Sequence, residues 1–113
     1  MLNIPLIVFA VTAILGLLLA AHVLRGKLAP WSLSPVHALL GATGLALMLT
    51  PLLSDTVTRP VQIGFALLLA AALLGFVLVS FHLRRKLPPK LLVFAHAGAA
   101  VSGFLTLLAT ALQ

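Results

Sequence analysis

Four long apolar segments constrain this chain more than any other feature. They span residues 5–24, 36–53, 61–83 and 91–112, and none of them contains Lys, Arg, Asp or Glu. A helix of about 20 apolar residues is long enough to cross about 30 Å of hydrocarbon. Charged residues make up only 7% of the chain, against roughly 25% in a soluble domain. The sequence therefore predicts an all-α integral membrane protein with four transmembrane helices.

The connections between these segments predict the topology. They are short, so consecutive helices are expected to be antiparallel neighbours in an up-down-up-down bundle, which forms one domain over residues 1–113. Proline residues lie at the segment boundaries, where they favour helix starts and stops. Six of the seven basic residues lie in the first and third connections: Arg25, Lys27, Arg84, Arg85, Lys86 and Lys90. The positive-inside rule then places these two connections in the cytoplasm and both termini on the outer face, which is the periplasmic face of a bacterial inner membrane.

An internal repeat relates the two halves, about residues 1–54 and 60–113. A shift of 59 residues without a gap matches residues of types that rarely coincide by chance: Arg25 with Arg84, Lys27 with Lys86, Pro30 with Pro89, His37 with His96, and Gly44 with Gly103. Two helical hairpins of the same orientation imply a pseudo-two-fold axis along the membrane normal. The second and fourth helices would then face each other diagonally, so that the two matched histidines meet across the axis.

Four histidines are the only ionisable residues within or at the margins of the apolar segments: His22, His37, His82 and His96. Antiparallel helices would place all four in one layer near the cytoplasmic surface. Ionisable residues at such positions are costly and mark a functional site by default. The alternative is that imidazoles decorate helix ends at the interface. It fits His22 and His82 best, because an arginine follows each within three residues.

Two of the histidines head a stripe of small residues on one helical face. The stripes comprise His37, Gly41 and Gly44, and His96, Ala100 and Gly103, each at positions i, i+4 and i+7. Small residues also serve close helix packing alone, but packing gives no reason for a histidine at the head of the stripe. A haem between the helices, with an imidazole as axial ligand on each side, explains both features. A six-coordinate iron of this kind suits electron transfer, because no coordination position stays open.

The segments 37–44 (His-Ala-Leu-Leu-Gly-Ala-Thr-Gly) and 96–103 (His-Ala-Gly-Ala-Ala-Val-Ser-Gly) carry a family resemblance. Together with the four-helix architecture, they resemble the membrane cytochromes of b type, the four-helix haem-binding anchors and quinone-linked cytochromes of bacterial respiratory chains. The resemblance implies haem b with axial ligation by His37 and His96. It also implies electron exchange with quinone or a partner oxidoreductase subunit. Two-haem members place ligands near both membrane faces, whereas this chain has histidines near one face, so one haem is expected and two are the alternative.

The other two histidines have a different expected role. His22 and His82 are offset by one residue in the repeat, which is about 100° around a helix. They remain alternative ligands, through the pairings of His22 with His37 or of His82 with His96. Otherwise we expect them to bind the haem propionates together with nearby cations, namely Arg25, Lys27, Arg84 and Lys86. The competing explanation for these cations is topology and binding of anionic lipid head groups.

Several kinds of chemistry are excluded by composition. The chain has no cysteine, so iron–sulfur clusters and zinc–thiolate sites are ruled out. Asp55 is the only carboxylate, which excludes paired acid–base catalysis, and no independent catalytic activity is expected. The net charge of +6 lies at the ends of apolar segments, so nucleic-acid binding is not expected. Two other functions remain open: a four-histidine zinc or copper site and a cofactor-free accessory subunit of a larger membrane complex.

Overall fold

The computed structural model covers residues 1–113 and contains four α-helices and no strand. The helices are α1 (Asn3–Leu24), α2 (Leu33–Leu52), α3 (Arg59–Leu83) and α4 (Lys90–Ala111). This confirms the prediction of an all-α four-helix bundle. Helix α2 begins three residues earlier than expected because Pro35 lies in its first turn, where a missing N–H costs nothing. Helix α3 likewise includes Pro60 in its first turn.

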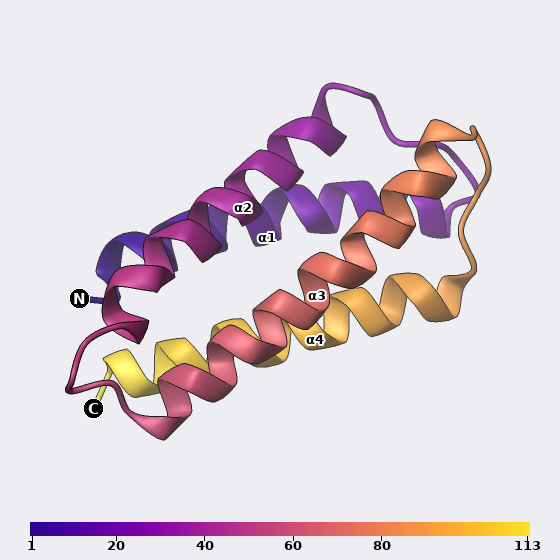
Figure 1. Ribbon diagram of the computed structural model, residues 1–113. Coiled ribbons are helices and arrows are strands. Elements are labelled where there is room, and N and C mark those ends of the chain that lie inside the picture. The colour runs from indigo at the N-terminus through magenta and orange to yellow at the C-terminus, as the bar shows by residue number, and fades with distance from the viewer.

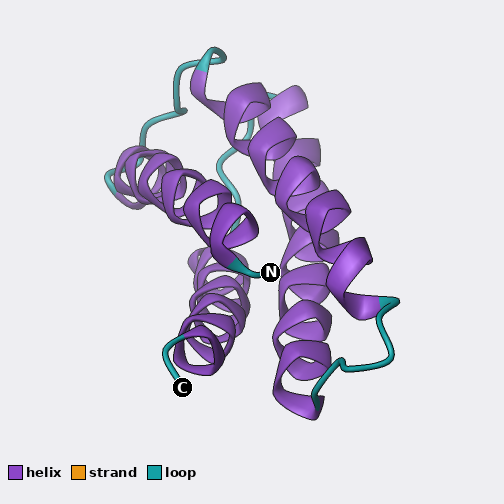
Figure 2. Cartoon of the chain, turned by 90° about the vertical axis from the view of Figure 1, so that its left-hand side faces the viewer, coloured by secondary structure: helices purple, strands orange, loops and turns teal.

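The helices form an elongated bundle that measures 45 × 23 × 20 Å. Figure 1 shows both chain termini and the 53–58 connection at one end, and the 25–32 and 84–89 connections at the other. Each hairpin packs its own two helices together, and the hairpins meet through α1 with α4 and through α2 with α3. Figure 2 views the bundle from the end with the termini and shows the helices arranged around a common axis. Helices α2 and α4 are therefore diagonal to each other.

The surface of the bundle is strongly apolar. Only 16 of the 113 residues are buried, and many large apolar side chains face outward, among them Ile7, Leu17 and Phe76, each more than 60% exposed. A soluble protein rarely exposes large continuous apolar patches. All four helices are long and apolar enough to cross a membrane. The architecture is therefore compatible with a multi-pass membrane protein.

Twelve of the buried residues form pairs that lie 59 positions apart. These pairs are Leu2 and Val61, Pro5 and Gly64, Phe9 and Leu68, Thr12 and Ala71, Gly44 and Gly103, and Met48 and Leu107. Met48 and Leu107 are both fully buried. The two hairpins therefore bury the same face of each corresponding helix, and this shared packing positions the residues of the site described below.

The helices α1 and α3 end in the same way. Gly26 and Arg85 both have positive φ, 77° and 53° respectively. The next residues donate backbone hydrogen bonds back into the helices, from Lys27 N to His22 O (2.9 Å) and from Lys86 N to Phe81 O (3.0 Å). This is the Schellman motif, in which a left-handed residue after the helix satisfies its last carbonyls. The second hairpin thus accommodates an arginine where the first has the more permissive glycine.

Candidate cofactor site

His37 of α2 and His96 of α4 approach each other across the bundle axis. Their ring centroids are 6.1 Å apart and their planes are inclined by 71°. When two imidazoles bind one metal ion from opposite sides, each metal–nitrogen bond measures about 2.0 Å. The centre of each ring lies about 1.1 Å behind the bonded nitrogen, so the two ring centroids are about 6 Å apart. The inclination adds no constraint, because an imidazole can rotate about its metal bond. The spacing therefore fits a single ion between the two rings.

The same hydrogen bond holds each of these rings. His37 Nδ1 donates to the carbonyl oxygen of Thr12 (2.9 Å), and His96 Nδ1 donates to the carbonyl oxygen of Ala71 (2.7 Å). Because a carbonyl oxygen can only accept, the proton of each neutral imidazole lies on Nδ1 and the lone pair lies on Nε2. Metal-binding histidines usually donate their other N–H to a carbonyl or carboxylate in this way. Both rings are thus oriented and in the tautomer that ligation by Nε2 requires.

Two glycines on the neighbouring helices make room for the rings. A Cβ atom at Gly16 would lie 2.9 Å from His37 Cε1, and one at Gly75 would lie 3.3 Å from His96 Cε1. A larger residue at either position would push against the imidazole. Sequence reasoning did not assign these glycines to the site. Their match in the 59-residue repeat is the signal that indicates them, although they lie on α1 and α3 and not on the helices of this histidine pair.

A cavity of about 660 Å³ surrounds the histidine pair. This volume lies within the range of small-molecule and cofactor sites, about 300–1,000 Å³. The walls contributed by α1 and α3 carry matched small or β-branched residues: Ala13, Gly16 and Ala20, and Ala72, Gly75 and Val79. The cavity is therefore mostly apolar, and two imidazoles from diagonal helices line it. Such a donor set and lining fit a flat apolar cofactor with an iron centre.

The predicted small-residue stripes divide between two roles. Gly41 and Ala100, one turn from the histidines, line the cavity. Gly44 and Gly103, expected to line the cofactor, instead lie where the helices of each hairpin pack. A Cβ at Gly44 would be 2.5 Å from Phe9 Cε1, and one at Gly103 would be 2.9 Å from the carbonyl oxygen of Gly64. Two turns from the histidines, the helices approach too closely for a cofactor.

The remaining two histidines differ from each other. His22 Nδ1 donates to the Leu18 carbonyl oxygen of its own helix (2.8 Å), and His22 does not line the cavity. His82 does line the cavity, and its ring stacks on Trp31 with centroids 4.0 Å apart. His82 Nε2 is buried and has no hydrogen-bond partner. The structure thus places one of the two predicted propionate-binding histidines at the cavity.

Among the basic residues, only Lys86 lines the cavity. Arg25 and Lys27 are exposed and lie outside the cavity lining. Arg84 also lies outside it, with its guanidinium 4.7 Å from the Phe81 ring centroid and its Nε donating to the Ser80 carbonyl oxygen. Three of the four cations expected beside the propionates are therefore directed elsewhere.

The four histidines do not converge on one point. No group of three or more His, Cys, Asp or Glu side chains is placed to hold a metal ion. His37 and His96 are the only two histidine rings in contact. The geometry therefore offers two nitrogen ligands, which leaves the other positions of an ion to a cofactor such as a porphyrin.

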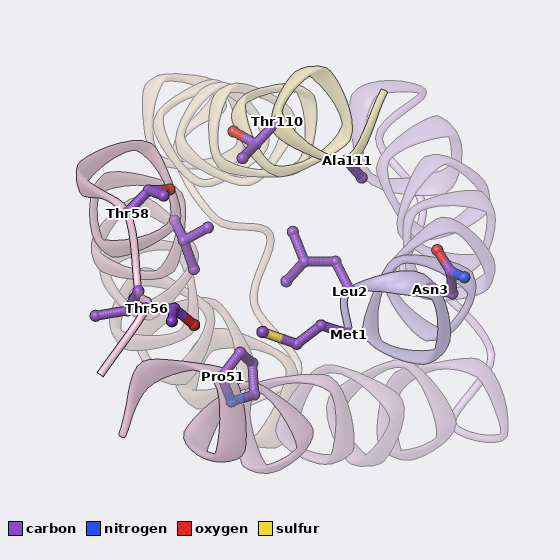
Figure 3. A pocket seen from close by; sticks show the side chains of 10 residues that line it. Met1, Leu2, Asn3, Pro51, Thr56, Thr58, Thr110 and Ala111 are labelled. Carbon is purple, nitrogen blue, oxygen red and sulfur yellow. The ribbon is translucent and has the colours of Figure 1, made fainter. Parts of the chain in front are cut away.

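A smaller hollow of about 260 Å³ lies at the opposite end of the bundle. Figure 3 shows Met1, Leu2, Pro51, Thr58 and Thr110 arranged around it. Its lining includes no histidine and no charged side chain. It therefore lacks the paired imidazoles found at the larger cavity.

Comparisons of the chain with protein-family models, curated proteins and solved structures gave no match. The functional inference therefore depends on the geometry of the site.

Proposed function

We propose that this chain is a membrane electron-transfer protein, or a small cytochrome subunit of a respiratory complex, that binds one haem b between His37 and His96. The observation that carries the proposal is the pair of imidazoles from diagonal helices, 6.1 Å apart. Each has its Nδ1 engaged with a backbone carbonyl and its Nε2 free. A single pair of facing rings favours one haem over two.

Each part of the chain has a defined task in this proposal. The histidines supply both axial ligands, and their hydrogen bonds to Thr12 and Ala71 fix the ring orientation. Gly16 and Gly75 let the rings lie against α1 and α3, and the apolar walls exclude water. Haem supplies reversible one-electron chemistry when bound. Because the protein occupies both axial positions, transfer of electrons is favoured over binding of a substrate to iron.

The proposed setting is the bacterial inner membrane. The bundle is 45 Å long, which matches the thickness of a bilayer with its head groups, about 40–45 Å. We propose an up-down-up-down orientation with the basic connections in the cytoplasm and both termini in the periplasm. The histidine pair would then lie in the cytoplasmic half of the membrane. Quinone or a partner oxidoreductase subunit would exchange electrons with the haem there.

Absorption and electron paramagnetic resonance spectra of the purified protein test the haem proposal. Wild-type protein produced with sufficient haem should show a Soret band, a reduced α-band and a low-spin ferric signal. His37→Ala and His96→Ala should each abolish the low-spin signal, because one axial ligand is lost. His22→Ala is the matched control, since His22 lies outside the cavity, and it should retain the signal. Wild-type protein without haem, or alanine variants that stay low-spin, would refute the proposal.

A further inference from the structure

The pseudo-two-fold symmetry of the cavity is broken near the basic connections. For three polar residues of the cavity lining near these connections, the residue 59 positions away is either apolar or outside the cavity lining. Ser34 corresponds to Val93, His82 to Val23, and Lys86 to Lys27. The two valines also line the cavity, whereas Lys27 does not. Helices α2 and α3 pack against each other, as do α1 and α4. Near the basic connections, the cavity lining along the seam between α2 and α3 is therefore polar, and the equivalent lining positions of α1 and α4 are apolar.

His82 contributes a buried hydrogen-bonding atom without a partner. Its Nε2 is inaccessible to solvent and makes no hydrogen bond. Leaving such an atom unpaired is unfavourable, and buried polar groups in native proteins are nearly always satisfied. The Trp31 ring lies almost parallel to the imidazole, inclined by 17°. Trp31 lies in the first connection, one residue before the Ser32 N-cap of α2, so this stack also connects the first hairpin to the end of α3 and holds the His82 ring in place.

Lys86 adds a positive charge that no side chain of this protein neutralises there. The only carboxylate side chain, Asp55, belongs to the connection at the opposite end of the bundle (Figure 1). Helix α2 also begins beside this end of the cavity, and the N-terminus of a helix favours a negative charge. The polar seam therefore combines an ammonium group, an imidazole and a hydroxyl with no internal anion. A carboxylate of a bound ligand has the complementary charge and accepts hydrogen bonds from all three groups.

We propose that Ser34, His82 and Lys86 form a carboxylate-binding subsite that orients the cofactor within the cavity. This inference rests on the proposed haem function, and the carboxylates are then the haem propionates. The porphyrin edge that carries them faces the seam between α2 and α3. The apolar opposite edge faces Val23 and Val93.

The test compares haem with haem dimethyl ester, in which both carboxylates are blocked. Purified apo-protein in detergent is titrated with each ligand, and the ratio of the two dissociation constants is measured for every variant. A charge-assisted hydrogen bond corresponds to a factor of about ten in affinity or more. Wild-type protein should therefore bind haem at least about tenfold more tightly than the ester. Comparing this ratio between variants cancels the different partition of the two ligands into detergent.

Three variants make the test specific. His82→Phe keeps an aromatic ring against Trp31 but removes the imidazole nitrogen, and Lys86→Gln removes the charge. Each should reduce the preference for haem to about threefold or less and leave the low-spin spectrum intact. Lys27→Gln is the control, because Lys27 corresponds to Lys86 in the repeat but lies outside the cavity lining. This variant should keep the wild-type preference for haem.

The outcomes separate this inference from the proposed function. The subsite is overturned if wild-type protein binds both ligands equally, or if His82→Phe and Lys86→Gln keep the full preference, while low-spin spectra persist. Those results would still support the proposal that His37 and His96 bind the haem iron. If wild-type protein forms no low-spin complex with either ligand, both the haem proposal and the subsite are overturned.

Discussion

Replacing Gly16 with alanine should weaken haem binding, because the added methyl group would take space used by the His37 ring. The new Cβ would lie 2.9 Å from Cε1 and 3.4 Å from Nδ1 of that ring. Non-bonded carbon atoms settle at about 3.5–4.0 Å. The imidazole must therefore retreat by about 0.6 Å or more, or α1 must move away from α2.

The cost of this retreat follows from how the ring is held. Moving His37 weakens its hydrogen bond to the Thr12 carbonyl oxygen, worth about 1 kcal/mol, or turns the side chain away from its rotamer at about 0.5–1.5 kcal/mol. One or both of these costs amount to about 0.5–2.5 kcal/mol, which corresponds to a haem affinity about 2- to 70-fold lower. The higher helix propensity of alanine does not compensate, because it stabilises α1 whether or not haem is bound.

Two further glycines provide matched comparisons. A Cβ at Gly75 would lie 3.3 Å from His96 Cε1, so a shift of a few tenths of an ångström suffices, and Gly75→Ala should weaken binding by less than about fivefold. A Cβ at Gly98 would meet no atom within 4 Å. Gly98→Ala should therefore bind haem as the wild type does.

Titration of each apo-protein with haem, followed by the Soret band, measures these affinities. The low-spin signal of the loaded proteins reports whether both imidazoles still bind. The expected order of affinity is wild type and Gly98→Ala first, then Gly75→Ala, then Gly16→Ala. Equal affinities for Gly16→Ala and Gly98→Ala would refute the reasoning, because they would show that the His37 ring does not depend on the space at residue 16.

Three other predictions concern packing, helix ends and topology. Gly44→Ala should destabilise the protein by about 1–3 kcal/mol, because its Cβ would collide with the Phe9 ring; unchanged unfolding in a detergent titration would contradict this. Arg85→Gly should raise stability by up to about 1 kcal/mol by relieving a left-handed residue, whereas a lower melting temperature would show that the arginine side chain contributes more than the strain costs. Alkaline phosphatase fused to either terminus should be active, as periplasmic termini require, and the orientation is wrong if only cytoplasmic reporters work there.

The helices could be predicted closely from the sequence because each one satisfies its own backbone hydrogen bonds. A run of about 20 apolar residues bounded by prolines fixes such a helix without reference to the rest of the chain. The pairing of His37 with His96 was likewise expected, because repeated hairpins place corresponding helices diagonally. These features depend on local sequence and on the internal repeat, and both can be recognised in the amino-acid sequence.

The tertiary structure alone decided which small residues border the cavity. The sequence offered Gly44 and Gly103 as readily as Gly16 and Gly75, but the first two lie in helix contacts and the second two lie against the histidine rings. Helices that are apolar on every side carry no polar face to fix their rotation about their own axes. Their rotation and crossing are set by side-chain packing between helices, which the sequence of one segment does not reveal.

The same reason explains the polar seam. The repeat matches Lys27 with Lys86, and nothing in the sequence distinguishes their roles, yet only Lys86 reaches the cavity. The contact of Trp31 with His82 joins residues from different hairpins, so no local pattern could indicate it. The sequence determined the helices, their boundaries and the candidate ligands. The packing of the two hairpins decided which of the matched side chains face the space between them.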